Sequence, residues 1–211
     1  VGFTNLSVNM KTNLFFLYLI LMIGITLYYR PRIFYYINKI KYYRLVESQE
    51  PPIRTKKPIG QNAWFELWLK DEFKVFKDTS NFTCLHRYTQ DKTSIPTRQP
   101  MIEIMIFIHN PSIGYHSKEV TELIHALEDH YQKESIKYKN YTLLQFKSGD
   151  MPIKDVEGLP EIMYEKESGR HITVVNFYYQ KDTEKIAYLR SKTYTPSLYY
   201  SYAIDLAEKY L

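Results

Sequence analysis

The sequence is poor in cysteine and glycine, with one cysteine, Cys84, and 7 glycines. A single cysteine excludes an intrachain disulfide and a metal site built from several cysteines, so nothing indicates an oxidising compartment. The glycines form no glycine-rich phosphate-binding loop. Tryptophan is also scarce at 2 copies, whereas tyrosine reaches 21. The tyrosine excess suits membrane interfaces and protein contacts, and the codon bias of an AT-rich genome is the alternative explanation.

Charge is unevenly distributed along the chain. Hydrophobic residues make up 45% and charged residues 24% of the sequence, as in a globular protein, and the formal net charge is +5. The excess of cations lies between Arg30 and Lys57, where only Glu47 and Glu50 oppose it. A local basic segment beside an apolar helix indicates lipid headgroups rather than nucleic acid. The predicted headgroup contacts are Arg30, Arg32, Lys39, Lys41 and Arg44.

An uncharged run from Leu14 to Tyr29 predicts one transmembrane helix within residues 1–30. As a helix it covers roughly 24 Å, against about 30 Å of hydrocarbon. Lys11 and Arg30 can reach outward to make up the difference. Tyr28 and Tyr29 stand where an interfacial aromatic belt is expected. A signal peptide is the rival interpretation, and it is weakened because no small-residue cleavage site follows the run.

The flanks of this run predict an orientation. One cation precedes the run and several follow it closely, so the rest of the chain is expected on the positive-inside face, the cytosol or the mitochondrial matrix. The chain begins with Val, which fits a removed presequence, and it has no cysteine pair. We therefore expect the mitochondrial inner membrane, with the C-terminal domain in the matrix.

Residues 31–62 and 63–100 are expected to connect the anchor to the main domain. Residues 31–62 combine a basic juxtamembrane helix, interfacial or continuing from the span, with a linker from Glu47 to Asn62 that Pro51-Pro52 marks. Apolar residues at helical offsets predict an amphipathic helix over 63–77. The stretch 78–100 is polar and poorly patterned, with one short strand expected near 82–86.

Residues 101–211 alternate strand and helix patterns and predict an α/β domain. Met101–Ile108 is almost wholly apolar and β-branched, as in a central strand that is covered on both faces. Ser117 is a suitable N-cap for a helix with a stripe through Val120, Leu123 and Leu127. The further expected elements are a strand at 141–146, a short helix at 159–166, a hairpin of strands 172–179 and 185–189, and a final helix from Thr195.

That order, β-α-β-α-β-β-α, resembles the thioredoxin fold over roughly residues 101–211. The segment His109–Lys118 lies where that family carries its Pro-Trp-Cys-X-X-Cys-Lys loop. The resemblance implies a mixed sheet flanked by helices, here preceded by one transmembrane helix. Both redox cysteines are missing, because the loop reads Ile113, Gly114, Tyr115, His116, Ser117, and Ile172 or Thr173 replaces the family's cis-proline. Without a thiolate, thiol-disulfide exchange is excluded.

The remaining reactive residues form no convincing site. His125 and His130 are five residues apart and do not share a helix face, and no carboxylates join His109 and His116. His116 and Ser117 are adjacent, a spacing that rarely permits proton transfer between side chains. The sequence therefore predicts no catalytic, cofactor-binding or metal-binding residue, and a protein that is not an enzyme.

Two functions remain open. The first is a non-catalytic accessory subunit of a multi-subunit membrane complex, such as a respiratory-chain complex of the mitochondrial inner membrane, with other subunits and membrane lipids as partners. The second is a redox-inactive, membrane-anchored relative of the protein disulfide isomerases that binds clients in the endoplasmic reticulum. Glycans at Asn81 or Asn140, which fit the acceptor pattern, would favour the second function.

Overall fold

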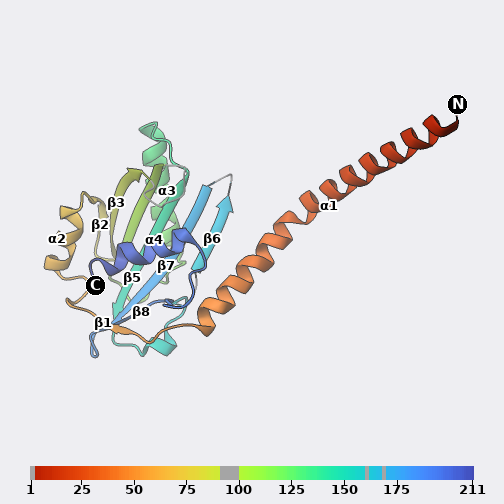
Figure 1. Ribbon diagram of the computed structural model, residues 1–211. Coiled ribbons are helices and arrows are strands. Elements are labelled where there is room, and N and C mark those ends of the chain that lie inside the picture. The colour runs from red at the N-terminus through yellow and green to blue at the C-terminus, as the bar shows by residue number, and fades with distance from the viewer. Residues whose placement is uncertain (1–2, 91–99, 160–161, 168–169) are drawn as a thin grey trace. The chain divides into compact units, whose positions relative to one another are not determined.

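The computed structural model describes residues 3–90, 100–159, 162–167 and 170–211 of the chain (Figure 1). The chain divides into two units, Val1–Lys41, here called the anchor unit, and Tyr42–Leu211, here called the domain. Helix α1, Phe3–Glu47, makes up the described part of the anchor unit and the first residues of the domain. The predicted juxtamembrane helix is therefore a continuation of α1, not a separate element.

The domain is built on one mixed sheet. Its described strands are β1 (Ile53–Arg54), β2 (Lys74–Asp78), β3 (Phe82–Gln90), β4 (Pro100–Ile108), β5 (Asn140–Gly149), β6 (Ile162–Glu167), β7 (Arg170–Gln180) and β8 (Lys185–Ala187). They lie in the order β1-β8-β7-β5-β4-β3-β2, and β6 also pairs with β7. The central strands β4, β5 and β7 are mutually parallel, and the other pairs are antiparallel.

Helices cover both faces of this sheet. Figure 1 shows α4 (Leu198–Glu208) in front of the sheet and α3 (Lys118–Lys133) behind it. The helix α2 (Asn62–Lys70) packs on the same apolar cluster as α4, and a short 3₁₀ helix, η1 (Ile153–Asp155), follows β5. The Ser117 hydroxyl accepts a hydrogen bond from the Val120 amide, so the predicted N-cap of α3 is confirmed.

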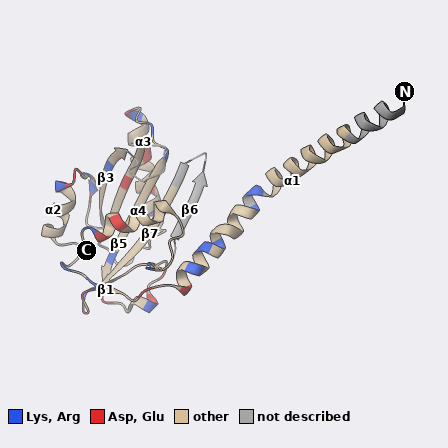
Figure 2. Ribbon diagram, viewed as in Figure 1, with Lys and Arg blue, Asp and Glu red and all other residues tan. Residues whose placement is uncertain are grey.

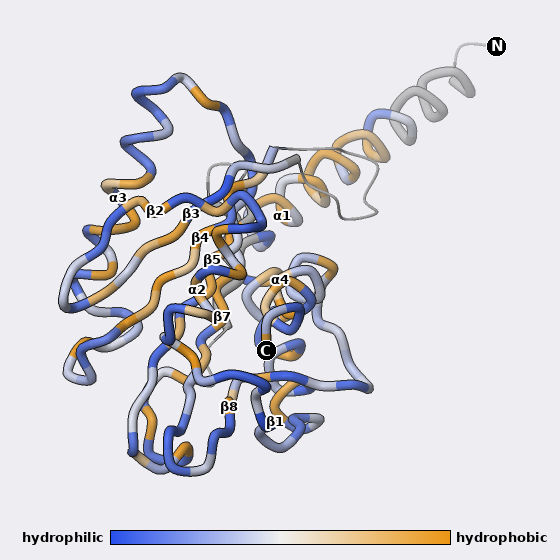
Figure 3. The backbone as a smooth tube through the Cα atoms, turned by 90° about the vertical axis from the view of Figure 1, so that its left-hand side faces the viewer, coloured by the Kyte–Doolittle hydropathy of each residue, from blue (hydrophilic) through white to orange (hydrophobic). Residues whose placement is uncertain are grey.

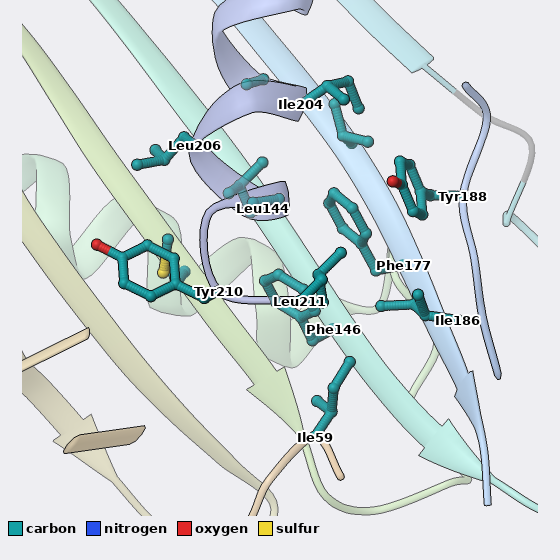
Figure 4. Close-up of a cluster of buried hydrophobic side chains, with 14 of the residues drawn as sticks. Ile59, Leu144, Phe146, Phe177, Ile186, Tyr188, Ile204, Leu206, Tyr210 and Leu211 are labelled. Carbon is teal, nitrogen blue, oxygen red and sulfur yellow. The ribbon is translucent and has the colours of Figure 1, made fainter. Parts of the chain in front are cut away.

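The core has two layers because the central strands are apolar on both faces. Alternate residues of β4 point to opposite sides, with Met105 and Phe107 in the layer under α2 and α4, and Ile104 and Ile106 in the layer under α3. Figure 4 shows the first layer, where Leu144 and Phe146 of β5 and Phe177 of β7 lie under α4 and the C-terminal residues. Hydrophobic residues recur along the strands in Figure 3.

The prediction of an α/β domain with a mixed sheet between helices, preceded by one apolar helix, is confirmed. The strand Met101–Ile108, the hairpin of β7 and β8, and the final helix are also as predicted. The thioredoxin-like identity of the sheet is not confirmed.

The short helix predicted at 159–166 is wrong. Residues 162–167 form strand β6, antiparallel to β7, while residues 160–161 lie outside the described residues. A short apolar run followed by Glu165, Lys166 and Glu167 has helical propensity, but pairing along the open edge of β7 outweighs that preference. The β-α-β-α-β-β-α order is therefore not the observed one.

Segments before residue 100 also contribute to the sheet. The helix expected over 63–77 ends at Lys70, because Glu72 takes a left-handed conformation with φ of 67° that turns the chain. Residues 74–78 and 82–90 then form β2 and β3, which extend the sheet beside β4. The linker predicted before residue 62 contributes β1 in the same way. Residues 91–99 lie outside the described residues.

Candidate functional site

The most distinctive surface of the chain is the apolar part of α1. Thr12–Arg30 is long and apolar enough to cross a membrane, a property that signal sequences share, and its side chains are exposed. Leu17 and Tyr28 are 67% and 73% exposed. The Thr26 hydroxyl is satisfied within the helix, because its Oγ1 donates to the Met22 carbonyl at 2.8 Å.

The predicted headgroup cations follow this span directly. The Arg32 guanidinium lies 5.9 Å from the ring centroid of Tyr29, and that of Arg30 lies 5.6 Å from Phe34. Residues 1–41 contain five cations and no Asp or Glu, so the whole formal net charge of +5 resides there and residues 42–211 balance to zero. In Figure 2 the Lys and Arg residues, in blue, lie on the second half of α1. Of the other predicted headgroup cations, Lys39 and Lys41 also belong to the anchor unit, and Arg44 belongs to the domain.

The loop between β4 and α3 is a packed connection. Ile113 and Tyr115 are buried, and Gly114 and His116 are exposed. The Tyr115 hydroxyl donates to the Phe177 carbonyl at 2.7 Å, and Lys147 Nζ donates to the Ile113 carbonyl at 2.9 Å. Burial raises the pKa of Tyr115. These bonds attach the loop to β5 and β7, while Ser117 caps α3.

A hydrogen-bonded chain that the sequence does not reveal lies at the end of β4. Thr83 Oγ1 donates to Asp78 Oδ1 at 2.6 Å and lies 2.8 Å from His109 Nε2. Because the single Thr83 proton goes to the carboxylate, His109 Nε2 must be the donor to Thr83. Burial lowers the pKa of His109. The arrangement orients the His109 ring, but it places the hydroxyl between the acid and the imidazole, which is not the order that activates a nucleophile.

His86, whose side chain is buried, packs among aromatic rings. His86 Nδ1 lies 2.6 Å from the Tyr131 hydroxyl, and its ring centroid lies 5.8 Å from Phe76 and 5.9 Å from His130. Burial, with the charges of His130 and Lys74, lowers the pKa of His86 to about 4. Within the described part of the chain, no three His, Cys, Asp or Glu side chains are placed to hold a metal ion.

This histidine predicts a loss of stability in mild acid. The ordinary pKa of His is 6.5, so the unfolded chain binds more protons than the folded one between pH 6.5 and pH 4. Stability is therefore expected to fall as the pH drops through this window, by about 2 kcal/mol from pH 7 to pH 5. Denaturant titrations at both pH values will measure the drop.

The loss of stability between pH 7 and pH 5 should be smaller in His86→Gln. It should persist in His125→Gln, whose side chain is on the exposed face of α3. An unchanged drop in His86→Gln would contradict this assignment.

Cys84 is expected to be unreactive in the folded protein. Its side chain is fully buried, and burial raises the pKa of the thiol to about 12. Since the thiolate is the reactive form, alkylation by iodoacetamide at pH 8 should be at least about a hundredfold slower in native buffer than in denaturant. Intact mass measured over time gives both rates. Equal rates in the two buffers would show that the thiol is accessible.

Comparisons with protein-family models, curated proteins and solved structures give no match to this chain. Its fold and surface define it as an α/β domain preceded by one helix that is able to span a membrane.

Proposed function

We propose that this chain is a non-catalytic accessory subunit of a multi-subunit membrane complex, held in the membrane by α1. The observation that carries the proposal is the anchor unit itself. Its apolar side chains are exposed along Thr12–Arg30, and they require lipid or protein cover because exposed apolar area costs about 25 cal/mol per Å².

The charge pattern supports the same role. The cations gather directly after the span, whereas residues 42–211 balance to zero net charge. A domain without an excess of cations suits docking against protein neighbours better than binding to nucleic acid.

The mitochondrial inner membrane, with the domain in the matrix and a respiratory-chain complex as the assembly, is the setting that we favour. Lys11 alone precedes the span, and Arg30, Arg32, Lys39 and Lys41 follow it, which supports a positive-inside placement of the domain. Such a role needs no redox chemistry from a domain that lacks the thioredoxin cysteines.

The headgroup contacts are proposed for Arg30 and Arg32 in particular. The headgroup region is only about 5–8 Å thick on each side, and Lys39 lies nine residues beyond Arg30, or about 13 Å along a helix. Arg30 and Arg32 are therefore the residues placed to reach phosphates, and Lys39 and Lys41 lie beyond the headgroup region.

Blue-native electrophoresis of gently solubilised native membranes tests the proposal. The chain, 25.4 kDa by sequence, is expected to migrate with one large assembly whose subunits mass spectrometry identifies. Migration as a monomer would refute the role as a subunit. An intact mass that lacks the first 30 residues would show instead that the apolar run is a cleaved signal sequence.

The anchor is tested by Leu21→Arg, which puts a charge at the middle of the span. A central Arg costs about 2.5–3.5 kcal/mol of insertion, so the variant is expected to shift into the carbonate-soluble fraction. Tyr88→Arg, at an exposed position of the domain, is the matched control and should remain in the membrane pellet.

The alternative function, binding clients in the endoplasmic reticulum, predicts a different observation, a glycan on the domain. Asn140 is 1% exposed within the folded domain and has no room for a glycan. Asn81 is half-buried at the turn between β2 and β3, and its Oδ1 accepts a hydrogen bond from Asn110 Nδ2 at 3.1 Å. A glycan found at Asn81 would place the domain in the lumen and favour the client-binding role.

A further inference from the structure

Four large side chains of α1 form a surface that we call the anchor stripe: Tyr29, Ile33, Tyr36 and Ile40. Their spacing of four, three and four residues places them on one face of a helix with 3.6 residues per turn. They are 44%, 47%, 61% and 54% exposed. This is the spacing at which one helix presents apolar side chains to another in a coiled coil.

Cations border the anchor stripe on both edges. Arg32 and Lys39, seven residues apart, lie along one edge, and Arg30 and Lys41 lie along the other. The anchor unit contains no Asp or Glu, so its formal net charge is +5. In a coiled coil, charges at such flanking positions select the partner.

We propose that the anchor stripe binds an amphipathic helix of a different protein, one with Asp and Glu beside its apolar face. This inference rests on the proposed role of the chain as a subunit of a complex. It adds which kind of partner binds the anchor unit. A parallel second copy of this chain is disfavoured, because it would bring cations of one copy against cations of the other.

The geometry of the anchor unit favours a protein helix over the lipid surface. α1 is helical without interruption from residue 31 to residue 41, so these residues rise about 16 Å beyond Arg30. That distance exceeds a headgroup region of about 5–8 Å. The outer part of the stripe therefore lies outside the membrane, where water does not stabilise Tyr36 and Ile40 and where an acidic helix would cover them.

Tyr35 and Tyr36 provide a matched pair for the test. They are the same residue type and are 63% and 61% exposed, but only Tyr36 is on the stripe. A benzoylphenylalanine photocrosslinker at Tyr36, in the full chain in its native membranes, is expected to give at least about tenfold more protein crosslink than one at Tyr35. Mass spectrometry should place that crosslink on a helical segment of another protein with carboxylates beside the linked residue.

Three crosslinking results would overturn the inference. They are crosslinks mainly to lipid from Tyr36, crosslinks to a second copy of the chain, and equal protein crosslinks from Tyr35 and Tyr36.

Substitution separates this inference from the proposed function. Tyr36→Glu is expected to reduce the large assembly on blue-native gels at least tenfold, whereas Tyr35→Glu should leave it unchanged, and both variants should stay in the carbonate-resistant pellet. A wild-type chain that is monomeric refutes the proposed function itself. A wild-type assembly that persists in Tyr36→Glu refutes only the anchor stripe as its docking surface.

Discussion

Replacing Arg87 with Ala is expected to destabilise the domain by about 3–5 kcal/mol. Arg87 of β3 faces Glu103 of β4 in register, and its Nε donates to Glu103 Oε2 at 2.6 Å. The Glu103 side chain is 0% exposed, and the Tyr202 hydroxyl from α4 also donates to it. Removing the guanidinium leaves a buried carboxylate without its cation, which costs far more than the loss of a surface ion pair.

The arginine has further contacts that add to this loss. Its Nη1 donates to the Asp71 carbonyl at 2.6 Å, and its guanidinium carbon lies 4.3 Å from the ring centroid of Phe73. The free energy of unfolding can be measured by denaturant titration of the solubilised chain, with tryptophan fluorescence as the probe.

Arg54→Ala is the matched control for this substitution. Arg54 pairs with Glu184 at 3.0 Å, but their side chains are 74% and 55% exposed, so the loss should stay below about 1 kcal/mol. If Arg87→Ala proves as mild as Arg54→Ala, the pair with Glu103 does not hold β3, β4 and α4 together.

The second large effect is expected from Trp64→Ala, at about 3–5 kcal/mol. Trp64 of α2 is fully buried, with its ring centroid 5.1 Å from Phe107 and 5.3 Å from Phe146. Its Nε1 also donates to the Tyr210 carbonyl at 2.8 Å. Truncation to Ala removes the aromatic contacts and leaves a cavity between α2 and the sheet. The same denaturant titration measures the loss.

The neighbouring tryptophan separates packing from hydrogen bonding. Trp68 is equally buried, but its Nε1 has no hydrogen-bond partner among the described residues. Trp64→Phe should therefore cost about 1 kcal/mol more than Trp68→Phe, since only the first leaves a carbonyl without its donor. Equal costs would show that the bond to Tyr210 contributes nothing to stability.

The sequence pattern predicted those elements that depend on residues close together in the chain. The strand Met101–Ile108 is apolar at every position except Glu103, so the sequence predicted a strand that is covered on both faces, and it is. Helix α3 follows from the cap at Ser117 and the buried stripe that begins at Val120. The cations after the span were equally visible, because headgroup attraction depends only on their place beside an apolar run.

Pairing between distant segments was not predictable in this way. β6 contains residues that favour a helix, Glu165, Lys166 and Glu167, and it is a strand because the edge of β7 offers backbone partners. The chain of Asp78, Thr83 and His109 joins the end of β2, the start of β3 and the residue after β4. Nothing in the spacing of those residues marks them, since only the register of three strands brings the side chains together.

The sequence by itself determined an apolar helix able to span a membrane, its flanking cations, the lack of a cysteine pair and the α/β class of the domain. Each of these follows from residues close together in the chain. Only the tertiary structure decided the strand order, the inclusion of residues 74–90 in the sheet, and the burial of Glu103 and His86. Those features depend on the energies of contacts between residues far apart in the chain, which no local pattern contains.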